Sequence, residues 1–241
     1  MRHVPRIYAP DLAPLAPLTL RGEAAKHLTG VMRLRPGDEF LAFPGNGHEW
    51  RATVSSISRD SVLATVGGLV RQEPPLPVIL ETWIGVVRAA RLDDAIEKCV
   101  EAGADIIRPV ICEFSQRGED ASKMKLERWR RIAVQAAEQS GRLFVPVVEP
   151  PRPLRPVLEQ FRGALVFGDG NGSPAHRLVE LLPSSGSLAW VVGPEGGLSE
   201  AEMALLKTQG GLPLSLGPYI FRTETAAVAG TAALRSATAL P

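Results

Sequence analysis

Short runs of alternating apolar and polar residues fill the first 72 positions, a pattern typical of β-strands. The alternation predicts strands at 6–8, 39–43, 48–57 and 61–70, with 6–8 at a sheet edge. Apolar residues at helical spacing predict a short helix within 23–33. Gly45-Asn46-Gly47 and Arg59-Asp60 predict tight turns. Short strands joined by tight turns indicate a small β-barrel.

The pattern changes after the proline-rich segment 73–77, which we expect to be an extended linker. Strands are predicted at 78–87, 106–111, 164–167, 188–192 and 213–216, and helices at 92–102, 123–139 and 225–239. Alternation of this kind predicts a mostly parallel sheet covered by helices. The predicted organisation is therefore a barrel domain at 1–72, a linker at 73–77 and an α/β domain at 78–241.

Two of the predicted C-terminal strands each end in a Gly-Pro loop that leads towards a helix. Ser199, with Glu202 three residues later, has the spacing of a capping box at a helix start. Ligands of α/β sheets bind at the carboxyl ends of the strands, and glycine allows the backbone to approach a ligand closely. By spacing alone, ordinary strand-to-helix turns explain these loops equally well.

Two long motifs carry a resemblance to a known family. Residues 190–202 read W-V-V-G-P-E-G-G-L-S-E-A-E, and residues 216–226 read L-G-P-Y-I-F-R-T-E-T-A. Together they resemble the signature of the bacterial RsmE family of the SPOUT superfamily. A-A-E-Q-S-G-R at 136–142, I-E-K-C-V-E-A-G at 96–103 and the early P-R-I-Y are also similar to family segments. The resemblance therefore covers essentially the whole chain.

The resemblance implies an α/β protein with a PUA-like, RNA-binding β-barrel followed by a SPOUT-type domain whose parallel sheet ends in a C-terminal trefoil knot. It implies an S-adenosylmethionine-dependent methyltransferase that modifies uracil N3 in 16S ribosomal RNA and acts as a homodimer. The cofactor would lie among the knot loops. The residues that match this site are Phe167, Gly168, Gly193, Pro194, Glu195, Gly196, Leu198, Leu216, Gly217 and Ile220.

The glycine-rich stretch 168–172 does not read G-x-G-x-x-G, and no P-loop motif occurs in the chain. A dinucleotide site or a P-loop nucleotide site is therefore disfavoured. The stretch is either a plain turn or, as the resemblance implies for Gly168, part of the cofactor pocket.

Uracil N3 carries a proton, so its methylation needs a base or a cation that stabilises the developing anion. Arg222 is expected to stabilise that anion, and Glu224 either accepts the N3 proton or orients Arg222. An ion pair that fixes the knot against a partner subunit is the structural alternative. The resemblance makes Glu138 either a further catalytic candidate or a dimer-interface residue, and Glu195 is expected to hold its loop rather than to react.

The formal net charge is only +1, but basic residues are segregated. Residues 1–35 contain six basic residues against two acidic ones, and residues 117–131 contain six against three. Such regions follow nucleic-acid backbones or are simply solvated surfaces. The stretches Arg88-Ala89-Ala90-Arg91 and Glu113-Phe114 depart from the family pattern, which puts RNA affinity in question. The candidate RNA-binding residues are Arg2, Arg6, Arg33, Arg88, Arg91, Arg117 and Arg142.

The remaining composition narrows the class of protein. No apolar run is long enough to span a membrane, and the N-terminus lacks a signal-peptide core, so we expect a cytoplasmic protein without membrane contact. Cys99 and Cys112 are expected to be buried thiols, and no spacing of Cys and His suggests a metal site. Two other functions stay open. These are a non-catalytic ribosome- or RNA-binding protein, and a methyltransferase with another target such as tRNA. Naked RNA and the assembled small subunit are both open as substrates.

Overall fold

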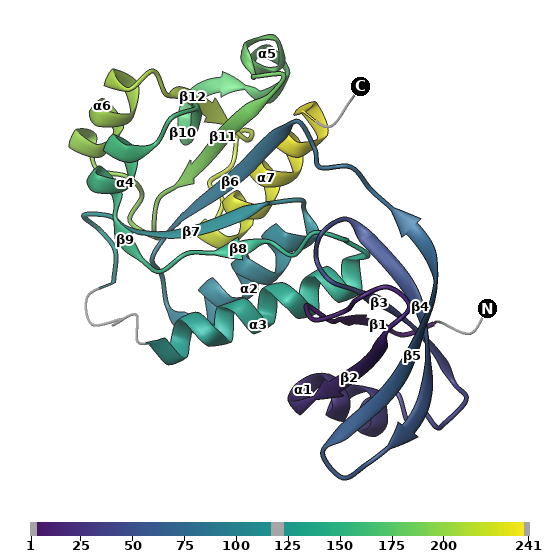
Figure 1. Cartoon of the computed structure of the whole chain (residues 1–241). Coiled ribbons are helices and arrows are strands. Elements are labelled where there is room, and N and C mark those ends of the chain that lie inside the picture. Colours follow the sequence, from purple (N-terminus) through teal and green to yellow (C-terminus); the bar gives the residue numbers. More distant parts are fainter. Residues whose placement is uncertain (1–3, 117–122, 239–241) are drawn as a thin grey trace. The chain divides into compact units, whose positions relative to one another are not determined.

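The computed structural model describes residues 4–116 and 123–238, and the chain divides into two compact units (Figure 1). The N-terminal unit consists of Met1–Pro75 with Ala137–Val145, and the larger unit consists of Leu76–Ala136 with Pro146–Pro241. The break after Pro75 falls inside the segment 73–77 that was expected to be a linker. The sequence did not predict that a second segment, Ala137–Val145, belongs to the N-terminal unit.

The N-terminal unit is built on a five-stranded sheet with the order β1-β3-β4-β5-β2. β1 pairs with β3 in parallel, and the other neighbours are antiparallel. The strands are Arg6–Tyr8 (β1), Pro17–Arg21 (β2), Glu39–Phe43 (β3), His48–Ile57 (β4) and Ser61–Gln72 (β5); the helices are Gly22–Lys26 (α1) and the π-helix His27–Val31 (η1). The four predicted strands and the edge position of β1 are confirmed.

One hydrophobic core is formed by inward-facing residues of all five strands, as expected of a small barrel. The alternation that predicted β4 and β5 buries Val54 and Val62, for example. β2 was missed, although Leu18 and Leu20 alternate with exposed residues in it. Its first residue is Pro17, which a strand accepts at its start but which weakens a sequence-based assignment.

The end of helix α3 (Lys123–Ser140) and the residues after it pack on the β-strands within the N-terminal unit. The backbone N–H of Tyr8 donates to Oε1 of Glu138 at 2.8 Å. Asn46, in the turn between β3 and β4, forms an isolated antiparallel bridge with Phe144. These contacts join residues about a hundred positions apart, so short-range patterns could not reveal them.

The larger unit contains a parallel sheet with the order β12-β10-β11-β6-β7-β8, and β9 also pairs with β7. Every pairing in it is parallel, as the alternation of strands and helices predicted. The strands are Val78–Gly85 (β6), Ile106–Ile111 (β7), Val147–Val148 (β8), Arg152–Pro153 (β9), Ala164–Pro174 (β10), Gly186–Val192 (β11) and Leu212–Ser215 (β12). The helices are Ala89–Glu101 (α2), Leu154–Gln160 (α4), Ala175–Leu178 (α5), the 3-10 helix Val179–Leu181 (η2), Glu200–Thr208 (α6) and Thr223–Thr238 (α7).

Helices cover both faces of this sheet (Figure 1). On one face α7 packs on β6 and β11 and contacts α2, and the hydroxyls of Thr82 and Thr231 lie 2.8 Å apart. On the other face, Leu158 of α4 and Leu206 of α6 share a core with Trp83. Cys99 and Cys112 are both buried free thiols, as the sequence predicted.

β10 continues beyond the four residues expected of it and includes the glycine-rich stretch. Its pairing with β12 shifts register between Gly168 and Ser173, so 168–172 is an irregular part of a strand rather than a plain turn. A Cβ on Gly172 would lie 2.6 Å from the carbonyl carbon of Pro213, so this strand pair requires glycine there. The helix α4, which follows β9, was not predicted; its N-cap is Pro153, and Pro156 lies in its first turn. The trefoil knot stays a prediction.

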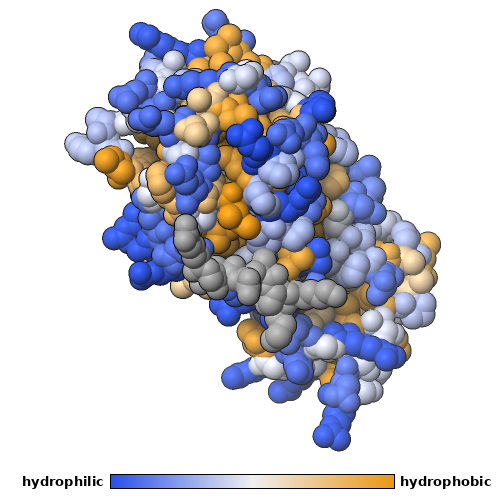
Figure 2. Space-filling model, turned by 90° about the vertical axis from the view of Figure 1, so that its left-hand side faces the viewer, coloured by the Kyte–Doolittle hydropathy of each residue, from blue (hydrophilic) through white to orange (hydrophobic). Residues whose placement is uncertain are grey.

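In the described ranges 4–116 and 123–238 no helix combines the length and apolarity needed to cross a bilayer. The face of the larger unit that carries α4 and α6 is mainly hydrophilic, with hydrophobic patches between the polar residues (Figure 2). Among the described residues of the larger unit, the most exposed large apolar residues lie in the loop that follows β12. There Tyr219 is 80% exposed and Ile220 is fully exposed.

A candidate active site at the ends of three parallel strands

A tight loop, residues 193–199, connects β11 to helix α6. The Ser199 hydroxyl accepts from the backbone N–H of Glu202 at 3.3 Å, and Oε2 of Glu202 accepts from the N–H of Ser199 at 2.9 Å. This is the capping box that the sequence predicted. Oε1 of Glu202 also accepts from the N–H of Glu113 at 2.8 Å, which ties the start of α6 to the segment after β7.

Glycine is required where this loop meets its neighbours. A Cβ on Gly193 would lie 2.6 Å from the carbonyl carbon of Gly197, across the turn. A Cβ on Gly85, at the end of β6, would lie 2.3 Å from the nitrogen of Pro194. Real Cβ atoms do not approach other atoms so closely, so the loop holds this form only with glycine at both positions. The Thr223 hydroxyl donates to the carbonyl oxygen of Gly193 at 3.0 Å and fixes α7 to the same loop.

A cavity of about 540 Å³ opens where β10, β11 and β12 reach their carboxyl ends. Its size lies in the range of small-molecule sites, and its position is the usual one for ligands of parallel sheets. Apolar side chains, among them Leu198, Leu216 and Ile220, line it. Glycines line it as well, and there the backbone itself borders the cavity. The charged residues that line it are Arg91, Asp169, Glu195 and Arg222.

Trp190 on β11 is fully buried, and its indole forms part of the cavity wall. The indole Nε1 donates to the carbonyl oxygen of Ala226 on α7 at 3.2 Å. On Gly230, one turn further along α7, an ideal Cβ would lie 2.2 Å from the ring. The Trp190 side chain therefore forms part of the cavity wall and also determines how closely α7 packs on β11.

Arg91, near the start of α2, lines the cavity and connects two carboxylates, of which Glu195 lines the cavity and Glu224 does not. Its Nη1 lies 2.9 Å from Oε1 of Glu195, and its Nε lies 4.0 Å from Oε1 of Glu224. The other oxygen of Glu224, Oε2, is buried and has no hydrogen-bond partner among the described residues. A buried polar atom without a partner costs about 1–3 kcal/mol, so this oxygen is suited to a donor from a bound molecule.

Arg222 lies between the apolar loop after β12 and the start of α7, and it lines the cavity. It is exposed, and within the described part of the chain its guanidinium forms no hydrogen bond or ion pair. In particular, no ion pair joins it to Glu224 there; the alternative of an ion pair against a partner subunit stays a prediction. The guanidinium is available to an anionic group in the cavity.

The cavity collects most of the residues predicted to bind the cofactor. Gly168, Gly193, Pro194, Glu195, Leu198, Leu216, Gly217 and Ile220 all line it. Two others do not. The Phe167 side chain is fully buried in the hydrophobic core against the α4 and α6 side of the sheet, and Gly196 faces Phe114, whose Cβ would lie 2.8 Å from a Cβ on this glycine.

Other residues of the cavity were missed by sequence reasoning. Trp190 was taken only as a strand residue, and Ala226 only as a helix residue. Arg91 was assigned to RNA, although its contact with Glu195 places it at the cavity. Trp190 could be identified only from the fold, which places its indole against Gly230 of α7. The sequence alone does not pair those two positions.

Glu138, the third catalytic candidate, belongs to the N-terminal unit and is not among the residues that line the cavity. Its carboxylate accepts the backbone N–H of Tyr8. Burial raises the pKa of the Glu138 carboxyl, while the Tyr8 N–H and the nearby His27 and Arg6 act in the opposite direction. The structure thus gives Glu138 a structural contact within the chain, and its catalytic role stays a prediction.

The candidate RNA-binding arginines fall into different environments. Arg6 is 11% exposed, pairs with Glu49 at 2.6 Å and donates to the carbonyl oxygen of Glu138 at 3.0 Å, so it holds the N-terminal unit together. Arg33 and Arg88 are exposed, whereas Arg142 is half-buried. Arg2 and Arg117 lie outside the described residues. RNA contact stays a prediction for all of these arginines.

Two family models and a curated relative show that this chain is similar to RNA methyltransferases. A family model described as an RNA methyltransferase domain matches residues 73–235, and one described as an RNA methyltransferase PUA domain matches residues 20–67. The ribosomal RNA small subunit methyltransferase E of Bacillus subtilis is 32% identical and covers 92% of this chain and 91% of its own length.

Solved structures give the same result. The ribosomal RNA small subunit methyltransferase E of Neisseria gonorrhoeae, bound to S-adenosyl methionine, is 31% identical with a TM-score of 0.84 over 97% of this chain and 98% of its own. A methyltransferase of Legionella pneumophila in complex with the same cofactor is 28% identical with a TM-score of 0.87 over 98% of both chains. The chain therefore belongs to the ribosomal RNA small subunit methyltransferase E family, the RsmE family that its two C-terminal motifs resemble.

Proposed function

We propose that this chain transfers a methyl group from S-adenosylmethionine to N3 of a uridine in small-subunit ribosomal RNA. A curated relative and a solved relative are both named ribosomal RNA small subunit methyltransferase E, and the solved one binds S-adenosyl methionine. The observation that carries the proposal is the cavity, which is lined both by Arg222, whose guanidinium is unpaired, and by Arg91, which contacts Glu224.

The residues of the cavity fit S-adenosylmethionine. The cavity volume of about 540 Å³ suits a ligand of this size, and Leu198, Leu216 and Ile220 supply apolar surface for an adenine ring. The glycines of the 193–198 loop leave backbone N–H and C=O groups free of side chains. The carboxylates of Asp169 and Glu195 are balanced in the lining by Arg91 and Arg222, and such mixed charge suits a ligand that carries both positive and negative groups. When bound, S-adenosylmethionine supplies a methyl group activated by its sulfonium, so the protein needs mainly to position the acceptor.

We assign residues of the chain itself to the methyl acceptor, the uracil base. Uracil N3 becomes nucleophilic as its proton leaves, and negative charge then spreads onto O2 and O4. We assign Arg222 to these oxygens because its guanidinium is unpaired and borders the cavity. We assign Glu224 to the N3 proton because its buried Oε2 has no partner among the described residues. Arg91 positions Glu224 and holds Glu195 in its loop, so Arg91 acts through these carboxylates.

We further propose how this chain binds RNA, in which oligomeric state and location it acts, and which form of the substrate it uses. The match to a PUA domain supports RNA binding by the N-terminal unit, for which Arg33 is an exposed candidate. We propose a homodimer, a cytoplasmic location and an assembled small subunit as the substrate. The last follows from the net charge of +1, because a weakly charged protein gains little affinity from RNA phosphates alone.

The test is methyl transfer with labelled S-adenosylmethionine. Small subunits from a strain that lacks this activity, their naked 16S RNA and bulk tRNA serve as three separate substrates, and the labelled nucleoside is identified by mass spectrometry. We expect 3-methyluridine, formed mainly in the assembled subunit. Label found only in tRNA would show a different RNA target. Cofactor binding without transfer to any substrate would favour a non-catalytic RNA-binding protein.

A further inference from the structure

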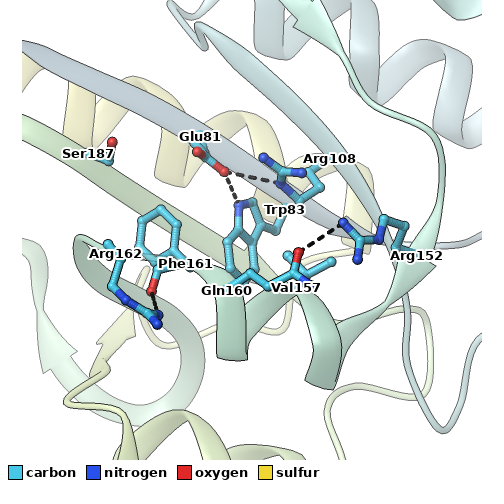
Figure 3. A pocket seen from close by; sticks show the side chains of 9 residues that line it. All are labelled: Glu81, Trp83, Arg108, Arg152, Val157, Gln160, Phe161, Arg162 and Ser187. Atoms are coloured by element: carbon cyan, nitrogen blue, oxygen red, sulfur yellow. Dashed lines mark hydrogen bonds and ion pairs between the residues drawn. The ribbon is translucent and has the colours of Figure 1, made fainter.

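A second cavity, of about 260 Å³, lies on the face of the sheet that α4 covers (Figure 3). β6, β7, β9, the end of α4 and the start of β11 border it, and it shares no lining residue with the candidate active site. Its apolar side is formed by Trp83 and Phe161, whose rings meet edge to face at 5.1 Å between centroids. The cavity is too small for a nucleoside cofactor and suits a small group.

The floor of this cavity carries a buried ion pair. Oε2 of Glu81 accepts from Nε1 of Trp83 at 2.7 Å and from Nε of Arg108 at 3.2 Å. The side chains of Glu81 and Arg108 are only 8% and 17% exposed. The charge of Glu81 is thus compensated by Arg108 and by the indole, and Glu81 offers little further attraction to another cation.

A second arginine reaches the cavity and has no acidic partner in the part of the chain that the structure describes. Arg152 on β9 pairs in register with Val110 of β7, two residues beyond Arg108 on the same strand face. Arg108 and Arg152 are therefore diagonal neighbours, and Figure 3 shows both side chains entering the cavity from one side. Among the described residues the only hydrogen bond of the Arg152 guanidinium is to Oε1 of Gln160, at 3.2 Å, and that group is neutral.

A third arginine, Arg162, also borders the cavity, and its Nη1 donates to the carbonyl oxygens of Phe161 and Glu159 at 2.7 and 2.8 Å. Three guanidinium groups thus border a space that contains a single carboxylate, which is already paired. Like charges at a partly buried site repel one another more strongly than in water. Such an excess of positive charge is relieved by an anion, and guanidinium groups bind phosphate through paired N–H donors.

We propose that this cavity is a phosphate-binding site formed by Arg108 and Arg152, with Arg162 at its rim. Its ligand is a phosphate group, either of a free small phosphate or of an RNA backbone. The site is separate from the active site, so the proposal does not depend on the proposed function.

The test compares the full-length wild-type chain with two variants of equal charge. Arg152→Gln removes the least compensated guanidinium. Arg155→Gln is the matched control, because Arg155 is exposed on the neighbouring helix α4 and does not line the cavity. Inorganic phosphate is titrated calorimetrically in phosphate-free buffer, and a short oligoribonucleotide is titrated separately. Binding of S-adenosylmethionine and thermal unfolding show that each variant is folded.

We expect inorganic phosphate to bind with 1:1 stoichiometry, and Arg152→Gln to weaken that binding at least about tenfold, since hydrogen bonds to charged groups are worth this much. Arg155→Gln should leave it unchanged. If phosphate does not bind but Arg152→Gln selectively weakens oligoribonucleotide binding, the ligand is the RNA backbone. If neither probe distinguishes the two variants, the proposal is wrong.

Discussion

Gly230 of α7 lies directly against the indole of Trp190 on β11. A Cβ placed on Gly230 would be 2.2 Å from Cε2 of the indole, which is far closer than real Cβ atoms come to other atoms. The indole also lines the candidate cofactor cavity and donates to the carbonyl oxygen of Ala226. Because position 230 has no side chain, α7 packs closely on β11 and the indole keeps its place in the cavity wall.

Gly230→Ala is therefore expected to destabilise the fold, although alanine is the better helix former. Overpacking of this kind costs about 1–3 kcal/mol of unfolding free energy, measured by urea denaturation. It should also weaken S-adenosylmethionine binding, because the indole has to move. Gly30→Ala is the control, since a Cβ there meets nothing within 4 Å. Equal stability of Gly230→Ala and the wild type would contradict the packing described.

Arg222→Ala tests the assignment of the anion-stabilising cation. Loss of one such group lowers the rate of the chemical step by about 10²–10³-fold, and we expect this for methyl transfer. Affinity for S-adenosylmethionine should change little, because Arg222 is assigned to the uracil oxygens. Single-turnover kinetics with saturating cofactor measures the effect. Turnover within a few fold of the wild type would show that the assignment is wrong.

Glu224→Gln replaces the proposed base by a neutral group of the same shape. Methyl transfer should fall by about 10²–10⁴-fold, the usual contribution of a positioned base. Raising the pH should recover part of the rate, because hydroxide then removes the N3 proton. Glu200→Gln, an exposed change on α6, is the control for the lost charge. A rate loss that does not respond to pH would instead indicate that Glu224 only orients Arg91 and its neighbours.

Glu138→Gln tests the buried carboxyl of the N-terminal unit. Burial raises its pKa in the folded state, so the folded state favours the protonated form. This contribution to stability is fully present below the ordinary pKa of 4.5 and is lost as the pH rises through the raised value. Glutamine does not titrate and keeps the acceptor for the Tyr8 N–H.

The variant should therefore gain stability relative to the wild type as the pH rises from acid to neutral, measured by denaturant unfolding across the pH range. Glu127→Gln, on the exposed part of the same helix α3, is the control and should show no such trend. A pH-independent difference between Glu138→Gln and the wild type would contradict the raised pKa.

Short-range sequence patterns correctly predicted the features that depend on only a few neighbouring residues. The Ser199 capping box and the alternating strand β4 are both encoded within a few residues. The family resemblance of the two motifs around Gly193 and Gly217 predicted which loops form the candidate site, whereas their spacing alone was equally compatible with ordinary turns.

The sequence could not reveal contacts that depend on distant packing. Whether Phe167 points into the core or the cavity is decided by which sheet face α4 and α6 cover. Gly196 appeared to be a ligand-facing glycine, but Phe114, some 80 residues earlier, occupies the space beside it. In the sequence, Arg91 cannot be distinguished from any other basic residue near a helix start. Only the fold brings Glu195 and Glu224 close to it.

The central claim is that S-adenosylmethionine binds in the cavity at the ends of β10, β11 and β12. Calorimetric titration of the purified chain tests it most directly, with ATP and NAD as competing nucleotides. Ala226→Leu places a larger side chain in the cavity wall, whereas Ala232→Leu makes the same change on the exposed side of α7. The account predicts selective binding that Ala226→Leu weakens at least about tenfold and Ala232→Leu leaves intact. Binding that is absent in the folded protein, or equal in both variants, would contradict it.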